Sequence, residues 1–282
     1  MTENQRNRSF TSIEAVNMGK QNGELMKAKS PVELGEVSVN SNTQEIDESL
    51  SDEVYELLWG HDRNTIPTAV DYAYEQIWKQ LVFSNEQKEQ RLSDVSLAEK
   101  LGVSRTPVRQ ALERLVQDSL VRYDPRRGFW VRMFTIQDIH EIYDLRSALE
   151  VLALHLAAPR LDPADLRSQL DLLYKVREQL DQRPISLFLQ CDFRLHTLLI
   201  RASGNGRLIN YLSTLRSQFS MFQVKDTRYP KRMETALDDH EQILLALLEG
   251  NIDKAAEFLA AHIAHAKANV LADIFEKQET SS

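Results

Sequence analysis

The stretch VSRTPVRQALERL, residues 103–115, decides the fold of the first half of the chain. Ser104 is a residue type that caps helix N-termini, and its hydroxyl is expected to accept a hydrogen bond from a first-turn amide. Pro107 then falls in the first turn, where its missing N–H costs no intrahelical bond. The stretch is predicted to form a helix whose apolar side chains share one buried face: Val108, Ala111, Leu112 and Leu115.

The polar face of this predicted helix carries basic residues near its N-terminus. Arg105, Thr106 and Arg109 are left exposed there when the apolar stripe is buried. An arginine guanidinium is a planar fork that matches guanine O6 and N7, or a phosphate. Helix-turn-helix proteins insert this end of their second helix into the major groove of DNA. Taken one at a time, however, these arginines would form an ordinary solvated face.

The neighbouring segments complete a small domain. Residues 68–83 have the apolar spacing of an amphipathic helix. Residues 92–102 predict a short helix that ends at a glycine, with these side chains turned inward: Leu92, Val95, Ala98 and Leu101. Residues 120–134 alternate around a turn at 124–128 and predict a two-stranded hairpin. Three helices and a hairpin indicate a winged helix-turn-helix domain, which we place at residues 65–133.

Charge is distributed unevenly along the chain. The formal net charge of −8 argues weakly against DNA binding. Residues 91–132, however, hold nine basic and five acidic side chains, a net of +4 that leaves −12 for the rest. The positive charge is therefore local, and local charge is what a DNA-binding surface needs. Arg126, Arg127 and Gly128 stand at the tip of the predicted hairpin, within reach of flanking phosphate or the minor groove.

Composition sets the broad class. The 282 residues are 42% hydrophobic, enough for a soluble protein with a real core. No apolar run approaches the length of a membrane span, no secretory signal is visible, and the single cysteine suits a reducing cytoplasm. Residues 1–64 are polar and predicted to be mostly disordered, with a transient helix favoured over a docked one at 49–60. We therefore expect a cytoplasmic protein without a membrane partner.

Residues 134–278 are predicted to form an all-helical domain. Apolar residues recur at helical spacing, and the breaks between them have turn chemistry. The helices are expected near 136–158, 162–182, 185–203, 206–224, 232–249 and 252–276. The predicted fold is therefore mostly α: a winged helix-turn-helix followed by a six-helix bundle.

Four polar residues fall on apolar faces of these predicted helices. Asp192 and His196 lie one turn apart, and His240 and His262 are in phase with leucines and isoleucines of two further helices. Burying polar groups is costly unless they find partners. A divalent metal ion is one common explanation, and the donor set suits Zn, Ni, Mn or Fe(II). Ordinary core histidines remain the alternative, because the helices are only assumed to converge.

Further residues are candidates for binding a ligand in the same domain. Arg146 is inward by the phase of its neighbours, so it is either a carboxylate clamp or a structural partner of Glu150. Asn205 either caps a helix or lines the pocket. Cys191 and His265 fall off the ligand phase, and His265 is the substitute ligand if His262 is not one.

The segment LSDVSLAEKLGVSRTPVRQALERLVQDSLVRYDPRRGFWV closely resembles the winged helix of the GntR family of bacterial transcription regulators, over residues 67–132. The resemblance implies that Arg105 and Arg109 contact bases or phosphate, with the DNA backbone contacted by Ser104, Thr106 and the wing tip. The chain departs from the family at Ser119, where a glycine is usual, and at Val95, where a charged contact is often found. The usual proline-glycine turn is replaced by NEQKEQR.

The later segments EIYDLRSALEVLALHLAA, DFRLHTLLIRASGN and DHEQILLALLEGNIDKAAEFLAAH resemble the FCD effector-binding domain of the FadR/VanR branch of GntR regulators, over about 135–270. In metal-containing members the positions that match Asp192, His196, His240 and His262 hold the ion. The resemblance therefore implies a divalent cation with open positions for a small carboxylate effector.

Together these features predict a regulator that is not an enzyme. It would bind a double-stranded DNA operator as a homodimer, because one short recognition helix reads few bases, and a small carboxylate would control that binding. A metal-dependent enzyme acting on a small carboxylate is the main alternative. A scaffolding DNA binder without a ligand is a third, against which the buried polar residues argue.

Overall fold

The computed structural model describes residues 68–83 and 89–279. The predictions made for residues 1–64, including the helix at 49–60, lie outside the described residues. Within the described part, no helix combines the length and the apolar character needed to cross a membrane.

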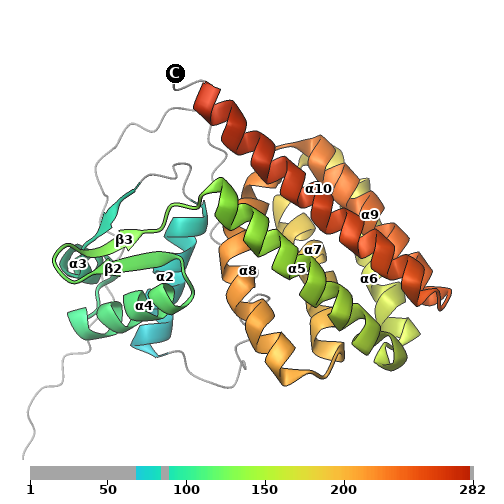
Figure 1. The fold of residues 1–282 in the computed structure, drawn as a ribbon, viewed down its shortest axis with the longest axis horizontal. Coiled ribbons are helices and arrows are strands. Elements are labelled where there is room, and N and C mark those ends of the chain that lie inside the picture. The colour runs from blue at the N-terminus through green and yellow to red at the C-terminus, as the bar shows by residue number, and fades with distance from the viewer. Residues whose placement is uncertain (1–67, 84–88, 280–282) are drawn as a thin grey trace, which may run out of the picture. The chain divides into compact units, whose positions relative to one another are not determined.

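The first part of the chain has the predicted helices and hairpin (Figure 1). A two-residue strand that the sequence analysis missed, β1, joins the hairpin in an antiparallel sheet of order β1-β3-β2. The observed elements are α2 (Ala69–Phe83), β1 (Arg91–Leu92), α3 (Asp94–Leu101), α4 (Arg105–Gln117), β2 (Val121–Asp124) and β3 (Gly128–Val131). This arrangement is a winged helix-turn-helix.

The inward face of α3 differs from the prediction. Leu92 is buried as part of β1, and the helix begins only after Ser93, whose hydroxyl accepts a hydrogen bond from the Ser96 amide. The later start puts Leu97 on the buried side and leaves Val95 41% exposed. The expectation that Val95 faces the core was therefore wrong, because the apolar spacing was counted from a residue that belongs to the strand.

Helix α4 follows the prediction closely, with one exception. Pro107 lies in the first turn, and the stripe of Val108, Ala111, Leu112 and Leu115 has no exposed surface. Ser104 occupies the N-cap position with extended backbone, but its hydroxyl makes no capping hydrogen bond. A free hydroxyl at this position remains available to an external acceptor such as a phosphate.

The turn after α4 holds a residue in an unfavourable backbone conformation. Ser119 has φ of 60°, in the left-handed region that favours glycine. A glycine at this position is expected to raise the free energy of unfolding by about 1 kcal/mol, because a side chain in this region costs about that much. Denaturant unfolding of Ser119→Gly and Ser119→Ala measures the effect. The alanine variant should show no gain, and equal gains in both would contradict the backbone explanation.

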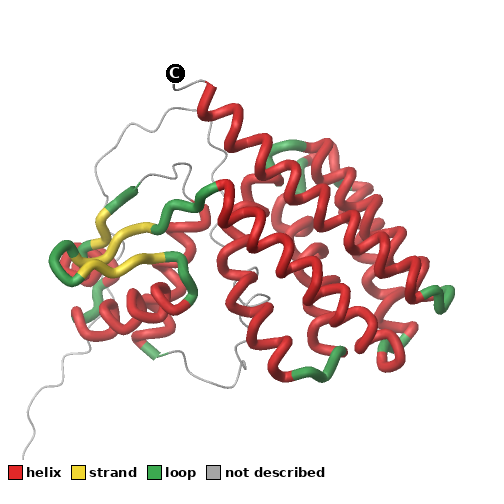
Figure 2. Tube along the Cα trace, in the orientation of Figure 1, coloured by secondary structure: helices red, strands yellow, loops and turns green. Residues whose placement is uncertain are grey.

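The second part of the chain is wholly helical (Figure 2). Its elements are α5 (Ile136–Ala157), η1 (Ala158–Arg160), α6 (Pro163–Glu178), η2 (Leu180–Gln182), α7 (Ile185–Ala202), α8 (Gly206–Asp226), α9 (Pro230–Leu248) and α10 (Ile252–Glu279). The six predicted helices are confirmed, with ends that shift by a few residues. Helix α5 packs against α7, α8 and α10, and α9 packs against α6 and α10.

Capping residues explain where several of these helices begin. Thr135 and Asp138 form a reciprocal capping box at the start of α5. Asp162 caps α6, whose first residue is Pro163, and the Asn251 side chain accepts from an amide in the first turn of α10. The starts of α5, α6 and α10 are therefore encoded locally, whereas α7 and α9 begin without a side-chain cap.

Candidate metal centre and nucleic-acid interface

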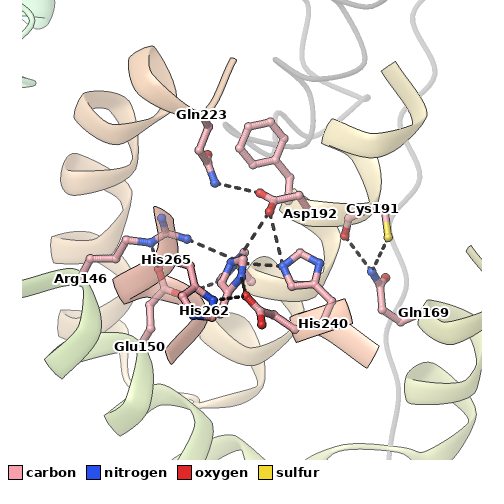
Figure 3. A network of polar contacts seen from close by, with 12 residues as sticks. Arg146, Glu150, Gln169, Cys191, Asp192, Gln223, His240, His262 and His265 are labelled. Carbon is pink, nitrogen blue, oxygen red and sulfur yellow. Dashed lines mark hydrogen bonds and ion pairs between the residues drawn. The ribbon is translucent and has the colours of Figure 1, made fainter. Parts of the chain in front are cut away.

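The four predicted metal ligands converge in the interior of the helical part (Figure 3). Helix α7 supplies Asp192 and His196, α9 supplies His240, and α10 supplies His262. One ligand atom from each lies within 4.8 Å of the others, and all four side chains are buried. The assumption that these helices converge is thus met by the structure.

The spacing of the donor atoms suits a small cation. His240 Nε2 lies 3.2 Å from His262 Nε2 and 3.5 Å from Asp192 Oδ1, and His196 Nε2 lies 3.9 Å from that same oxygen. Bonds of about 2.0–2.2 Å to zinc place tetrahedral ligand atoms roughly 3.3–3.6 Å apart. The side chains present therefore fit a divalent ion of this size with only small adjustments.

His240 and His262 are held in the neutral state that binds metal. Burial, together with the neighbouring histidines, lowers the pKa of His240 well below its usual range, and burial also lowers the pKa of His262. Neutral imidazoles offer a lone pair, whereas protonated ones do not.

Outer partners form hydrogen bonds to two of the four side chains, and a carboxylate lies near a third. Gln223 Nε2 donates to Asp192 Oδ2 at 2.9 Å, and Glu150 Oε2 lies 2.5 Å from His196 Nδ1. Asp239 Oδ2 lies 3.4 Å from His262 Nδ1, which is too long for a strong hydrogen bond. Such partners orient metal-binding side chains in proteins.

The tautomer of His196 follows from its neighbour. An ionised carboxylate only accepts hydrogen bonds. Nδ1 of His196 therefore carries a hydrogen and donates a hydrogen bond to Glu150. In the neutral imidazole, Nε2 then keeps its lone pair, 3.3 Å from Arg146 Nη2 and 3.9 Å from Asp192 Oδ1. Glu150 therefore fixes the tautomer that a metal ion requires.

Arg146 is both a partner of Glu150 and an incompletely satisfied cation. Its Nε donates to Glu150 Oε1 at 2.8 Å, and its Nη2 lies 3.3 Å from His196 Nε2. Its Nη1 is buried without a hydrogen-bond partner. The structural pairing is thus present, and a further donor remains for an anion. The inward face was predicted from Ile142, Leu145 and Leu149, and this was partly wrong, because Leu145 is 53% exposed.

Charge interactions keep this pair ionised. Burial alone would raise the pKa of Glu150, but its interactions with His196 and with the Arg146 guanidinium outweigh burial and lower that pKa. Burial alone would lower the pKa of Arg146, but interactions led by the charge of Glu150 together outweigh burial and raise that pKa. Beside the four cluster residues there is consequently a fully buried ion pair.

A pocket adjoins the cluster and shares two of its side chains, Asp192 and His262. Charged and polar residues line part of it, and apolar residues line the rest: Phe188, Leu189, Met233, Ala236 and Ala266. The cluster therefore borders a space that a small molecule can enter.

The other candidate residues of the helical part lie outside the four-residue cluster. The Asn205 side chain accepts from the Leu208 amide at the start of α8 and does not line this pocket. Cys191 is buried against Gln169, and burial raises the pKa of its thiol to about 12. His265 is largely exposed, donates through Nδ1 to Asp239 Oδ2 at 2.8 Å, and lies outside the four-residue group.

The recognition face of α4 is exposed, as predicted. Arg105, Thr106 and Arg109 all lie on the surface. Arg105 Nη2 donates to Asp94 at 3.0 Å, and Arg109 Nε donates to Glu113 at 3.3 Å. Solvent-exposed ion pairs of this kind contribute little, so both guanidinium groups can exchange these partners for DNA.

The wing tip is shaped by one aspartate. The backbone N–H groups of Arg126 and Arg127 both donate to Asp124 Oδ1, and Gly128 follows with φ of 84°. The Arg127 guanidinium also lies over the Trp130 ring, 4.9 Å from its centre. Both arginine side chains are exposed at the end of the hairpin.

Fold and site together define a winged-helix DNA-binding protein with an all-helical ligand domain. The model of the bacterial regulatory proteins of the gntR family matches residues 70–131, and the FCD domain model matches residues 141–265. The chain belongs to the GntR family and carries an FCD domain, so it is a DNA-binding transcription regulator.

Known proteins of this kind resemble much of the chain. The HTH-type transcriptional regulator YdhC of Bacillus subtilis is 29% identical over 68% of this chain and 86% of its own length. A probable D-xylose utilization operon transcriptional repressor of Paenarthrobacter nicotinovorans is 28% identical over 61% of this chain and 75% of its own. The Escherichia coli McbR/YncC structure shares the fold, with a TM-score of 0.63 at 23% identity, over 74% of this chain and all of that one.

Arg109→Ala is expected to weaken operator binding by about 1–3 kcal/mol if the side chain contacts a base edge. The reason is the loss of a bidentate donor at the groove-facing end of α4. Electrophoretic mobility shifts against the specific site and a scrambled duplex measure the effect. Arg207→Ala, an exposed arginine in the helical part, is the matched control. An unchanged affinity in Arg109→Ala would exclude base reading by this residue.

Proposed function

We propose that a small carboxylate effector controls operator binding from a metal site formed by Asp192, His196, His240 and His262. The observation that carries the proposal is the position of Arg146, whose buried Nη1 lacks a partner while its Nη2 lies beside His196. A divalent cation held by the four side chains would lie next to this guanidinium and repel it. An anion that contacts both would relieve the repulsion.

The donor set indicates which ions fit. Three imidazoles and one carboxylate suit Zn, Ni, Mn or Fe(II). A bound ion would offer Lewis-acidic positions to a carboxylate oxygen. The protein's own residues would do the rest: Arg146 binds the anion, and Glu150 keeps both Arg146 and His196 in position.

Helix α5 connects this site to the DNA-binding part. It carries Arg146 and Glu150, and it begins five residues after the wing strand ends at Val131. Arg132, in this short connection, donates to Asp138 at 2.6 Å, and Asp138 also belongs to the capping box of α5. A shift of α5 on effector binding would therefore reach the wing through few rotatable bonds.

The regulator acts as a homodimer on a two-fold related operator in the cytoplasm, where the DNA is. The effector shifts the equilibrium between two dimer arrangements that differ in the separation of the recognition helices. The Paenarthrobacter relative is named as a probable repressor, which favours repression as the direction of control. Light scattering of the purified chain, with and without DNA, tests the oligomeric state. A monomer at micromolar concentration under both conditions would rule out this mechanism.

An enzymatic function has less support. The two carboxylates beside the cluster, Glu150 and Asp239, are both engaged by histidine or arginine side chains. Neither of these carboxylates is therefore free to act as a general base. The relatives described above are named as regulators.

The test combines metal analysis with operator release. The purified full-length chain is expected to contain about one divalent ion per protomer, measured by plasma mass spectrometry. A panel of small mono- and dicarboxylates is then titrated against the protein bound to its operator. We expect at least one carboxylate to change operator affinity only in the metal-loaded protein. An equal response after chelation would refute the role of the metal, and no response to any carboxylate would refute effector control.

A further inference from the structure

The pocket beside the metal cluster is acidic at one end. Asp226, at the end of α8, lines it together with Arg232 from α9. Arg232 Nη1 donates to Asp226 Oδ1 at 2.8 Å, and the same guanidinium donates to both oxygens of Asp273 at 2.7 and 3.0 Å. Among the described residues that line the pocket, Arg232 is the only arginine or lysine, and its single charge is shared between two carboxylates, so it cannot balance both.

This excess charge lies in a poorly solvated place. The side chains of Asp226 and Arg232 are 16% and 17% exposed. Burial raises the pKa of Asp226 to about 7, although Arg232 opposes that rise. A further cation or N–H donor beside Asp226 would stabilise its ionised form.

A second acceptor lies in the same pocket and lacks a donor. Gln223 lines the pocket from α8, and its Oε1 is buried without a hydrogen-bond partner. Its orientation is fixed chemically, because the amide nitrogen must face the Asp192 carboxylate (Figure 3). Gln223 and Asp226 are three residues apart on one helix, so both acceptors lie on the same face.

We propose that the effector is an amino-carboxylate, such as an α-amino acid, whose ammonium group binds to Gln223 Oε1 and the Asp226 carboxylate. This inference rests on the proposed function, because the carboxylate of the ligand is held at the metal site and Arg146. An ammonium group supplies three donors and one positive charge, which match one unpartnered amide oxygen and one uncompensated carboxylate. A hydroxyl group in its place could donate to Gln223 but would leave the charge of Asp226 unbalanced.

The pocket also indicates which amino-carboxylates to try. Its remaining lining includes Phe188, Leu189 and Met233, so an apolar substituent on the ligand meets apolar side chains. Arg232 is the only arginine or lysine among the described residues that line the pocket, and it is already bound by two aspartates. A second acidic group on the ligand would therefore find no free cation there.

The first test compares matched ligands on the full-length chain reloaded with Zn²⁺. Each pair differs only in an amino or a hydroxyl group: L-alanine and L-lactate, L-leucine and its 2-hydroxy analogue, L-phenylalanine and L-3-phenyllactate. Calorimetric titration should show, in at least one pair, that the amino acid binds tenfold or more tightly than the hydroxy acid. Equal or weaker binding of the amino acid in every pair would overturn the inference.

The second test separates the protein's contribution from metal chelation, because amino acids also bind Zn²⁺ through their nitrogen. Asp226→Asn keeps the size of the side chain and removes its charge, so the amino acid should lose tenfold or more in affinity while the hydroxy acid is unaffected. Asp273→Asn is the matched control, since it also removes a carboxylate from Arg232 but does not line the pocket. It leaves Arg232 to Asp226 alone but keeps the Asp226 carboxylate as the direct partner of the ammonium group, so it should reduce the preference far less than Asp226→Asn does.

The outcomes distinguish the two levels of the proposal. A preference for amino acids that persists in Asp226→Asn assigns it to the metal and overturns the inference. Binding of hydroxy acids without any preference also overturns it, but leaves the proposed function standing. No binding of either class by the metal-loaded chain would count against both.

Discussion

Replacing Glu150 with alanine is expected to lower the free energy of unfolding of the helical part by about 3–5 kcal/mol. Glu150 and Arg146 are 1% and 0% exposed, and the carboxylate is the anionic partner bonded to the guanidinium. Its removal leaves a buried cation without a counter-charge and also deprives His196 of the acceptor at Nδ1. Both losses act in the apolar interior, where solvent cannot replace the missing partner.

Urea unfolding of the metal-free protein, followed by helical circular dichroism, measures this effect. All three tryptophans lie before the helical part, so tryptophan fluorescence provides a separate signal that should change less. Glu150→Gln retains an acceptor and should lose less than the alanine variant. The double variant Arg146→Met, Glu150→Leu removes both charges and should recover most of the stability. A loss below 1 kcal/mol in Glu150→Ala would show that the buried pair does not matter for stability.

The spacing of apolar residues within each helix was enough to predict many of the buried positions from the sequence. The buried stripe of α4 and the inward positions of His196, His240 and His262 all follow from which apolar residues share a face. These inferences need only the spacing within one helix. The same reasoning failed for Val95, because it cannot tell where a short helix starts when a strand residue precedes it.

The outer partners of the cluster could not be predicted in this way. Gln223 and Asp239 carry no pattern that links them to Asp192 or His262, since their contacts depend on how α8 and α9 are rotated in the bundle. Glu150 was identified only as the neighbour of Arg146, and its contact with His196 joins α5 to α7. Contacts between helices thus require the three-dimensional structure, whereas the inward direction of one side chain does not.

Replacing His196 with alanine is expected to weaken binding of the metal ion by more than about 100-fold, because even the loss of an outer partner costs 10- to 100-fold. The substitution removes one of four converging donors and the contact between Arg146 Nη2 and the cluster. Effector-dependent release of the operator should disappear, while operator affinity without effector stays close to that of the native chain. Metal content after dialysis and mobility shifts with and without carboxylate measure the two effects.

His265→Ala is the control that makes this result specific. His265 also contacts Asp239 and lines the pocket, but its side chain is 54% exposed and it is not one of the four clustered residues. It should retain the metal ion and the effector response. Equal losses in both variants would mean that the pocket as a whole was disturbed. Full metal content in His196→Ala would show that His196 is not needed to hold the ion, and would contradict the four-ligand site.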